Sequence, residues 1–187
     1  MATLAPPDAE LIAAAAAGNL SAFSELVRLH RQRVLRTAAG IVGSTDEAED
    51  VAQQVFIRVW ERLDDYDPSG SFVSWLYRIT VNMAIDTLRR RRNEAPLGED
   101  MPSNAEGPER QLLVADERQQ VRNAIAQLPD KTRAALILRE YEQLSYKEIA
   151  AALKIPIGTV MSRLNYARRA VASILQREDP DVSDAPQ

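Results

Sequence analysis

The sequence predicts an all-α protein made of two small helical domains joined by a flexible linker. Ala, Leu, Arg, Glu and Gln dominate, glycine numbers seven among 187 residues, and β-branched residues rarely alternate with polar ones, so strands have little to form from. Residues 93–110 hold three prolines, two glycines and five acidic residues with almost no large apolar side chains. Such a segment cannot bury enough apolar surface to offset the conformational entropy that it would lose on folding. We therefore expect helical domains at 8–92 and 111–176, a flexible acidic linker at 93–110 and an acidic tail at 177–187.

Composition limits the chemistry that the chain can perform. With 45% hydrophobic residues, a chain of this length can bury a core. It has no cysteine and one histidine, His30, which excludes disulfide frameworks, thiol catalysis and the common zinc sites. Carboxylate-only metal sites remain possible but lack support, and we expect no cofactor.

The N-terminal apolar run LIAAAAA is not typical of a secretory signal. Asp8 and Glu10 precede it, where a signal would carry basic residues. No stretch of 18 apolar residues occurs anywhere in the chain, as a membrane-spanning helix would require. We expect a soluble cytoplasmic protein with no membrane contact of its own.

Charge is segregated along a chain whose formal net charge is -4. Residues 68–93 carry five basic residues against one acidic, and residues 121–177 carry ten against four. Local potential rather than net charge governs attraction to phosphates. The acidic total therefore does not exclude nucleic acid as a partner.

The first domain begins with a helical pattern over residues 23–42, where Phe23, Leu26, Val34 and Ile41 recur at helical spacing. His30 falls on the same stripe. Without a second histidine or a cysteine, it is expected to be a packed or rim residue rather than a metal ligand.

The next helix is expected to begin after Ser44 or Thr45, since either can cap a first turn that is acidic and complements the helix dipole. Its predicted core stripe is Val51, Val55, Val59 and Leu63. A different face carries Asp50, Gln53, Gln54, Ile57 and Glu61. An apolar Ile57 among acidic and amide groups favours a recognition patch for a partner protein, although spacing alone leaves a plain solvated face as the alternative.

A Pro/Ser/Gly loop follows and leads into a helix that ends in the run Arg89 to Arg92. Phe72, Leu76, Ile79 and Met83 are predicted to face inward. The other face carries Trp75, Arg78, Asn82, Asp86 and Arg89. Aromatic rings stack on unpaired bases, amides and carboxylates read base edges, and arginines hold the backbone, which is how single-stranded nucleic acid is bound. Phe72 and Trp75 could also be core residues, and for Phe72 we favour the core.

The second domain opens with Pro129 at a helix N-terminus and carries Leu136, Ile137 and Leu138 toward a core. Ser145 and Glu148 predict a capping box that starts a short helix over 146–153. After a break at KIPIG, a second helix is expected from Thr159 to about Leu175, with a buried stripe formed by Val160, Leu164, Ala167, Val171 and Ile174. Two short helices joined by a tight turn are the helix-turn-helix signature.

The exposed face of this last helix predicts duplex DNA binding. Hydroxyls, an aromatic ring and guanidiniums suit phosphate oxygens and base edges in a major groove. The alternative is that the arginines are only the solvent-exposed face of a surface helix. The capped helix and turn that precede them favour DNA binding over this alternative. The residues on this face are Thr159, Ser162, Arg163, Tyr166 and Arg169.

These stretches together resemble a known family. DAEDVAQQVFIRVW, FVSWLYRITVNMAIDTLRRRR, LPDKTRAALILREYEQLSYKEIA and IGTVMSRLNYARRA occur in the order expected of a bacterial sigma-70-type RNA polymerase sigma factor of the extracytoplasmic-function (ECF) group. The resemblance covers nearly the whole chain. It implies a sigma region 2 domain at 8–92, a sigma region 4 domain at 111–176 and the linker between them.

The resemblance also implies partners and a role for each surface: the β′ clamp helices and β flap of core RNA polymerase, promoter DNA and a cognate anti-sigma factor. Polymerase binding is implied for Asp50, Gln53, Gln54, Ile57, Arg58 and Glu61. Capture of the melted minus-10 element is implied for the loop at 65–74 and the helix after it, with Tyr66, Ser71, Trp75, Arg78, Asn82, Asp86 and Arg89. Reading of the duplex minus-35 element is implied for Thr159, Met161, Ser162, Arg163, Asn165, Tyr166 and Arg169.

Three departures from the family pattern involve four positions. Gln54 replaces a common Glu, Lys154 occupies a turn position usually held by Gly, and Met161 and Tyr166 replace residues that are commonly basic. A left-handed backbone at Lys154 would cost on the order of 1 kcal/mol.

Two other classes of function are open to a chain of this kind. A stand-alone helix-turn-helix regulator would share the C-terminal half and bind duplex operator DNA without polymerase, but would leave the face of Trp75, Arg78 and Asn82 without a purpose. A small helical enzyme would need a base beside its target. His30 lies in an apolar pattern and the carboxylates cluster in linker, caps and tail, so we expect no enzyme.

Overall fold

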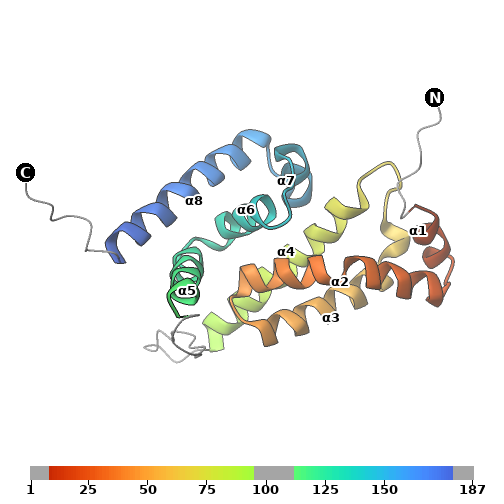
Figure 1. The fold of residues 1–187 in the computed structure, drawn as a ribbon. Helices are drawn as coiled ribbons and strands as arrows, with labels where there is room; N and C mark the ends of the chain where they lie inside the picture. Colours follow the sequence, from red (N-terminus) through yellow and green to blue (C-terminus); the bar gives the residue numbers. More distant parts are fainter. Residues whose placement is uncertain (1–8, 95–111, 179–187) are drawn as a thin grey trace, which may run out of the picture.

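The computed structural model describes residues 9–94 and 112–178, and within these ranges every regular element is a helix. The predicted all-α class is confirmed. The expectations for the linker and the tail fall largely outside the described residues. The elements are α1 (Ala9–Ala16), α2 (Leu20–Val42), α3 (Thr45–Glu61), the 3-10 turn η1 (Leu63–Asp65), α4 (Phe72–Glu94), α5 (Leu112–Ala126), α6 (Asp130–Glu140), α7 (Tyr146–Leu153) and α8 (Ile157–Glu178) (Figure 1).

Local capping sets where α2 and α3 begin and end. The Asn19 side chain accepts hydrogen bonds from the backbone N–H groups of Ser21 and Ala22 at 3.0 and 3.1 Å, so α2 starts at Leu20 rather than at Phe23 as predicted. Gly43 ends the helix with φ of 79°, a conformation that glycine adopts without strain. Of the two predicted caps for α3, Ser44 is the one that forms.

Helices α1 to α4 form one bundle, and its buried apolar residues belong to a core that continues into the second half of the chain. Val34, Ile41, Val55 and Leu76 are almost completely buried in it. His30 is 4% exposed and lies edge-on to the Phe72 ring, with 5.4 Å between ring centroids. The predictions of a packed His30 and a core position for Phe72 are therefore confirmed.

Helices α5 to α8 form a second bundle in which the predicted stripe of α8 is buried most deeply at Val160, Leu164 and Ala167. The predicted capping box is present: the Ser145 side chain accepts from the Glu148 N–H, and the Glu148 carboxylate accepts from the Ser145 N–H. Hydrogen bonding between these two residues lowers the pKa of the Glu148 carboxyl. Helix α8 begins at Ile157, two residues before the predicted Thr159.

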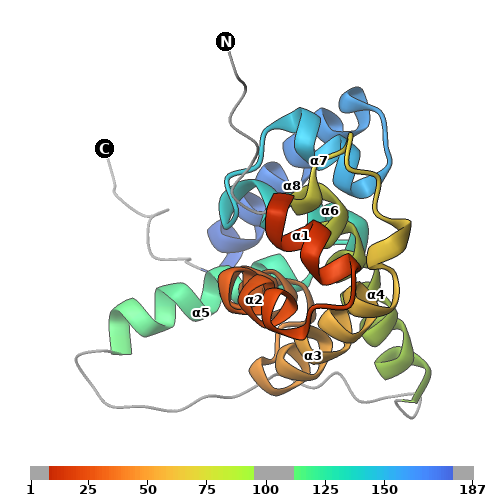
Figure 2. The same cartoon turned by 90° about the vertical axis from the view of Figure 1, so that its right-hand side faces the viewer.

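The two bundles pack against each other, with α6 and α7 of the second resting on α2 and α4 of the first. Figures 1 and 2 show the order of the layers: α8 lies on the outer side of α6 and α7, and α3 lies on the far side of α2 and α4. Helices α3 and α8 therefore face opposite sides of the molecule.

Candidate functional site

The first candidate surface is an apolar groove between α2 and α3. Ile57 is 52% exposed, and Trp60 beside it packs against Phe23 of α2 in a tilted arrangement, with ring centroids 4.8 Å apart. Leu20 and Phe56 also contribute to the apolar lining. Exposed apolar side chains that line one concavity are typical of a surface that binds a partner.

The polar residues predicted for this surface lie along the same side of α3. Asp50, Gln53 and Gln54 are exposed, and the first two line the groove. Arg58 and Glu61 form an exposed ion pair at 3.5 Å. Trp60 and the α2 side of the groove were not predicted from the sequence, although Trp60 follows Ile57 by three positions and therefore shares its face.

The second candidate surface starts at the loop between η1 and α4, where three aromatic rings meet. The centroids of Tyr66, Phe72 and Trp75 lie 5.6 to 5.8 Å from one another. The Tyr66 hydroxyl donates to the Gly70 carbonyl at 2.8 Å and so closes the loop on itself. Partial burial is the main reason why the pKa of the Tyr66 phenol is raised.

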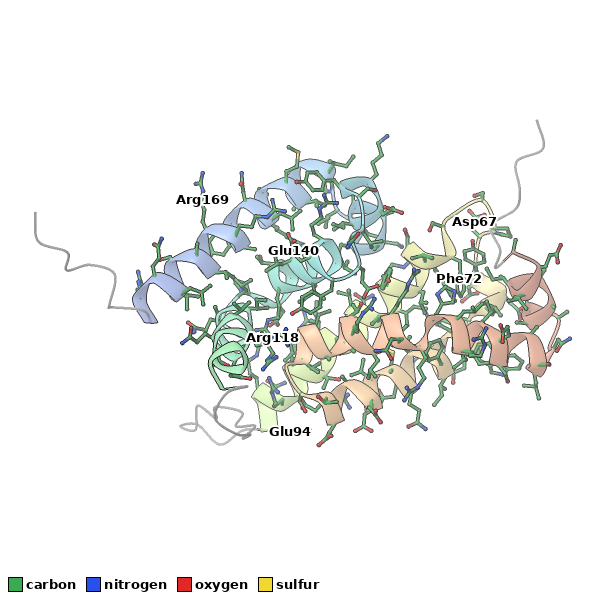
Figure 3. All side chains as sticks on the ribbon, viewed as in Figure 1. Asp67, Phe72, Glu94, Arg118, Glu140 and Arg169 are labelled. Carbon is green, nitrogen blue, oxygen red and sulfur yellow. The ribbon has the colours of Figure 1, made fainter. Side chains whose placement is uncertain are left out.

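The same loop is held by two short polar contacts. The Asp67 carboxylate accepts from the Ser69 N–H at 2.9 Å and from the Ser69 hydroxyl at 2.8 Å, and these bonds lower the pKa of Asp67. The Ser71 hydroxyl accepts from the Ser74 N–H at 3.3 Å, so this predicted DNA contact also caps α4. Figure 3 shows Asp67 at the tip of the loop and Phe72 turned toward the bundle.

The predicted outward face of α4 continues from these aromatic rings. Trp75 and Arg78 are half-buried, whereas Asn82, Asp86 and Arg89 are exposed. An exposed ion pair at 3.5 Å joins Asp86 and Arg89. An aromatic ring, a cation and an amide thus follow one another along a single helix face.

The third candidate surface is the outer face of α8. Met161 is 52% exposed and Tyr166 is 56% exposed, and Arg169 points away from the bundle (Figure 3). Thr159 and Arg163 are half-buried, and Ser162 and Asn165 are exposed. Arg168 is different from its neighbours, because it is paired with Glu140 of α6 at 3.0 Å.

The turn between α7 and α8 sets where α8 begins. Lys154 adopts φ of 51° and ψ of 50°, so the left-handed conformation considered from the sequence is present. Its N–H caps α7, and the Pro156 carbonyl then accepts from the N–H groups of Thr159 and Val160 in the first turn of α8. A capped short helix, a tight turn and a longer helix form the helix-turn-helix arrangement.

The predicted residues thus form three separate surfaces, on α3, on the loop and face of α4, and on α8, rather than one pocket. Within the described ranges, no group of three or more His, Asp or Glu side chains is arranged to hold a metal ion. None of the helices in residues 9–94 and 112–178 is long and apolar enough to cross a membrane. Surfaces of this extent are suited to binding macromolecules.

Comparison with known proteins places the chain in a family. Residues 26–94 match Sigma-70 region 2, and residues 118–171 match Sigma-70 region 4. The RNA polymerase sigma-H factor of Pseudomonas aeruginosa is 35% identical over 181 residues, which span 90% of this chain and 94% of that protein. The ECF RNA polymerase sigma-E factor of Escherichia coli K12 is 35% identical over 85% of this chain and 89% of its own length. The chain belongs to the sigma-70 family of RNA polymerase sigma factors, in the ECF group.

Solved structures agree with this assignment. CnrH in complex with the cytosolic domain of CnrY matches with a TM-score of 0.70 and 28% identity, over 91% of this chain and 98% of CnrH. The sigma factor RpoE of Bartonella quintana, in complex with the anti-sigma factor NepR, matches with a TM-score of 0.67 and 26% identity, over 82% of this chain and 96% of RpoE.

Proposed function

We propose that this ECF sigma factor binds core RNA polymerase through α3, captures the melted minus-10 strand on α4 and reads the minus-35 duplex with α8. The observation that carries the proposal is the presence of three separate surfaces in one chain, each with the chemistry that one of these contacts needs. We further propose that the protein has no active site. The polymerase performs the chemistry, and the sigma factor selects where it starts by differential binding.

Polymerase binding is assigned to the groove and the polar residues of α3. Partly exposed Ile57 and Trp60 offer apolar surface, and Asp50, Gln53 and Gln54 beside them offer hydrogen-bonding groups. A buried apolar centre with a polar rim is the usual anatomy of a protein interface. As a partner of the polymerase, the protein would work in the cytoplasm.

Capture of the minus-10 element is assigned to the aromatic cluster and the face of α4. Tyr66 and Trp75 supply ring faces for stacking, and Asn82 supplies an amide that can read a base edge. Tyr66, Phe72 and Trp75 brace one another, so little further ordering is needed when a base is bound. Pre-organisation of this kind favours affinity because fewer rotamers are lost on binding.

Reading of the minus-35 element is assigned to the exposed face of α8. Arg163 and Arg169 can reach phosphates and base edges, and Asn165 can bond to adenine. A wrong base at a position read in this way is expected to cost about 1–3 kcal/mol. Phosphate contacts should also make promoter binding strongly dependent on salt.

Control by an anti-sigma factor is part of the proposal. The Bartonella quintana relative was solved with its anti-sigma factor NepR, which supports this type of partner for the present chain. Such a partner would compete with polymerase for the apolar groove between α2 and α3.

The test is a run-off transcription assay with purified core RNA polymerase and promoter DNA from upstream of the protein's own gene. Specific initiation is expected with the wild type and should be weakened by Arg163→Ala and by Asn82→Ala. Matched controls are Arg168→Ala, whose side chain is held by Glu140, and Asn123→Ala on α5, where the side chain bonds to Gln119. Both controls should initiate nearly as well as the wild type.

The competing function is that of a stand-alone helix-turn-helix regulator. Tight binding to duplex DNA without polymerase, combined with no initiation in the run-off assay, would support that class and contradict ours. A regulator would also be insensitive to Asn82→Ala, because the face of α4 would not contact its operator.

A further inference from the structure

Three exposed residues form a row along α8, starting at the first residue of the helix. Ile157 is 42% exposed and Met161 is 52% exposed. Asn165 follows four positions after Met161 and is also exposed. Residues four apart are neighbours on a helix surface, so two apolar side chains and an amide follow one another. We call Ile157, Met161 and Asn165 the α8 row.

The packing of the second bundle does not account for the apolar part of this row. The stripe that α8 buries consists of Val160, Leu164 and Ala167, which are 0–1% exposed. Ile157 and Met161 lie beside this stripe, and Pro156 next to them is exposed as well. Exposed apolar side chains that gather at one place are typical of a surface that binds a partner.

The charge around the α8 row favours duplex DNA as this partner. From Thr159 to Arg177 the helix carries four arginines and no acidic residue, and such a field attracts phosphates. The recognition helix of a helix-turn-helix places its N-terminal residues at base edges in the major groove. The α8 row begins at the first residue of α8, so it lies at the end that would enter the groove.

The polar neighbours of the α8 row leave this side of the helix without a free cation. Arg168 lies three positions after Asn165 and shares its side, but its Nη2 donates to the Glu140 carboxylate at 3.0 Å. The Ser162 hydroxyl donates to the Thr159 carbonyl at 3.0 Å. Guanine is most often read by the two donors of an arginine or by a lysine. The α8 row offers apolar carbon, sulfur and an amide instead.

These groups match the major-groove edge of an A·T pair. Thymine presents a C5-methyl group there, and the N6 and N7 atoms of adenine pair with the amide of asparagine. We propose that the α8 row selects A·T pairs in the upstream promoter element. Met161, supported by Ile157, contacts the methyl group of a thymine, and Asn165 bonds to a neighbouring adenine. The inference rests on the proposed function, because it states which bases the minus-35 surface reads.

Removal of single methyl groups from the DNA tests the role of Met161. Each thymine of the upstream element, on either strand, is replaced in turn by deoxyuridine, which pairs normally and lacks only the C5-methyl group. Holoenzyme formed from core polymerase and the full chain is titrated against each promoter in a mobility-shift assay. Affinity of the wild type is expected to fall about fourfold at one or two thymines, which is the effect of exposing one methyl-sized group.

The variants of Met161 assign this loss to one side chain. Met161→Ala should bind the unmodified promoter about fourfold more weakly, and deoxyuridine at the sensitive position should cause no further loss. Met161→Leu keeps an apolar side chain of similar size and should keep most of the methyl sensitivity. The matched control is Leu29→Ala on α2, where an apolar side chain is 42% exposed. It should keep the wild-type ratio of thymine to deoxyuridine affinities.

Adenine analogues test the role of Asn165 in the same assay. In 7-deazaadenine the N7 acceptor is replaced by carbon, so the wild type should lose about two- to tenfold in affinity at one adenine. Asn165→Ala should not respond to this analogue at that position. A response equal to that of the wild type would overturn the assignment of Asn165.

The methyl scan overturns the proposal if no thymine responds in the wild type, or if Met161→Ala keeps the wild-type ratio of thymine to deoxyuridine affinities. Equally weaker binding of Met161→Ala to every DNA would assign Met161 to a polymerase contact instead. An upstream element made only of G·C pairs would also contradict the proposal. Run-off transcription on the unmodified promoter separates the two possible failures. If the wild type initiates and the methyl scan is flat, only this inference fails, whereas the absence of initiation contradicts the proposed function on which it rests.

Discussion

Replacing Lys154 by glycine should stabilise the second bundle, although it removes a side chain. The residue sits in the left-handed region, at φ 51° and ψ 50°, and its side chain is exposed. A side chain with a Cβ atom costs about 1–2 kcal/mol in this region. Glycine removes that cost. It also makes the unfolded chain more flexible, which lowers the free energy of unfolding by about 0.4–1 kcal/mol. The net expectation is a gain of about 0.5–1 kcal/mol in the free energy of unfolding.

Thermal unfolding of the full chain, followed by circular dichroism, measures this gain. For a cooperative unit the size of the full chain, a gain of about 0.5–1 kcal/mol corresponds to a rise of about 1–4 °C in Tm. Lys147→Gly is the matched control, because Lys147 is an exposed lysine inside α7, where glycine should destabilise by about 0.5–1 kcal/mol. Gln143→Gly offers a second test, since its φ is 55°. If Lys154→Gly lowers Tm as Lys147→Gly does, the left-handed turn is not strained and our reasoning is wrong.

Three further predictions concern binding and pH. Ile57→Ala removes apolar surface from a side chain that is 52% exposed. Its affinity for core polymerase, measured by titration, should therefore fall about three- to tenfold. The control Val121→Ala on α5 should bind core polymerase as tightly as the wild type does. Arg163→Ala should reduce the slope of log affinity for promoter DNA against log salt by about one, and an unchanged slope would remove Arg163 from the phosphate contacts. Burial and the hydrogen bond to Glu142 raise the pKa of the Tyr77 phenol above its ordinary value of 10.0. The raised pKa belongs to the folded state, so this contact contributes fully below about pH 10 and is lost as the pH rises further. The free energy of unfolding should therefore fall more steeply above pH 10 in the wild type than in Tyr77→Phe, and equal pH profiles would argue against the contact.

Local features of the fold could be predicted from the sequence because the groups that cause them are close along the chain. The span of α7 follows from Ser145 and Glu148, three residues apart, and the structure has the helix at the predicted residues 146–153. The start of α2 was missed because the Asn19 cap lies before the apolar pattern and not within it. Helix α8 begins two residues before the predicted Thr159, because the Pro156 carbonyl accepts from the N–H groups of Thr159 and Val160 and so closes the first turn.

Helical periodicity alone does not predict which residues of α4 are buried. Phe72 and Leu76 are buried as predicted, but Ile79 and Met83 are only half-buried, and Tyr77 is 2% exposed. A single stripe is the expectation for a helix that packs on one neighbour. Helix α4 packs on its own bundle and on α7 of the other, so its buried arc is wider than one stripe.

By itself, the sequence determined the helical class, the sigma-factor family and which side chains share a helix face, since composition, capping and helical spacing are properties of short segments. Only the tertiary structure decided that the two bundles pack against each other. Glu142 bonds to Arg36 and Tyr77, which are 106 and 65 residues away in the chain, and a side chain on Gly40 would clash with Ile137. No local pattern distinguishes a turn glutamate or a helix glycine of this kind from a solvent-exposed one, because the burial that gives each its role is created by the other bundle.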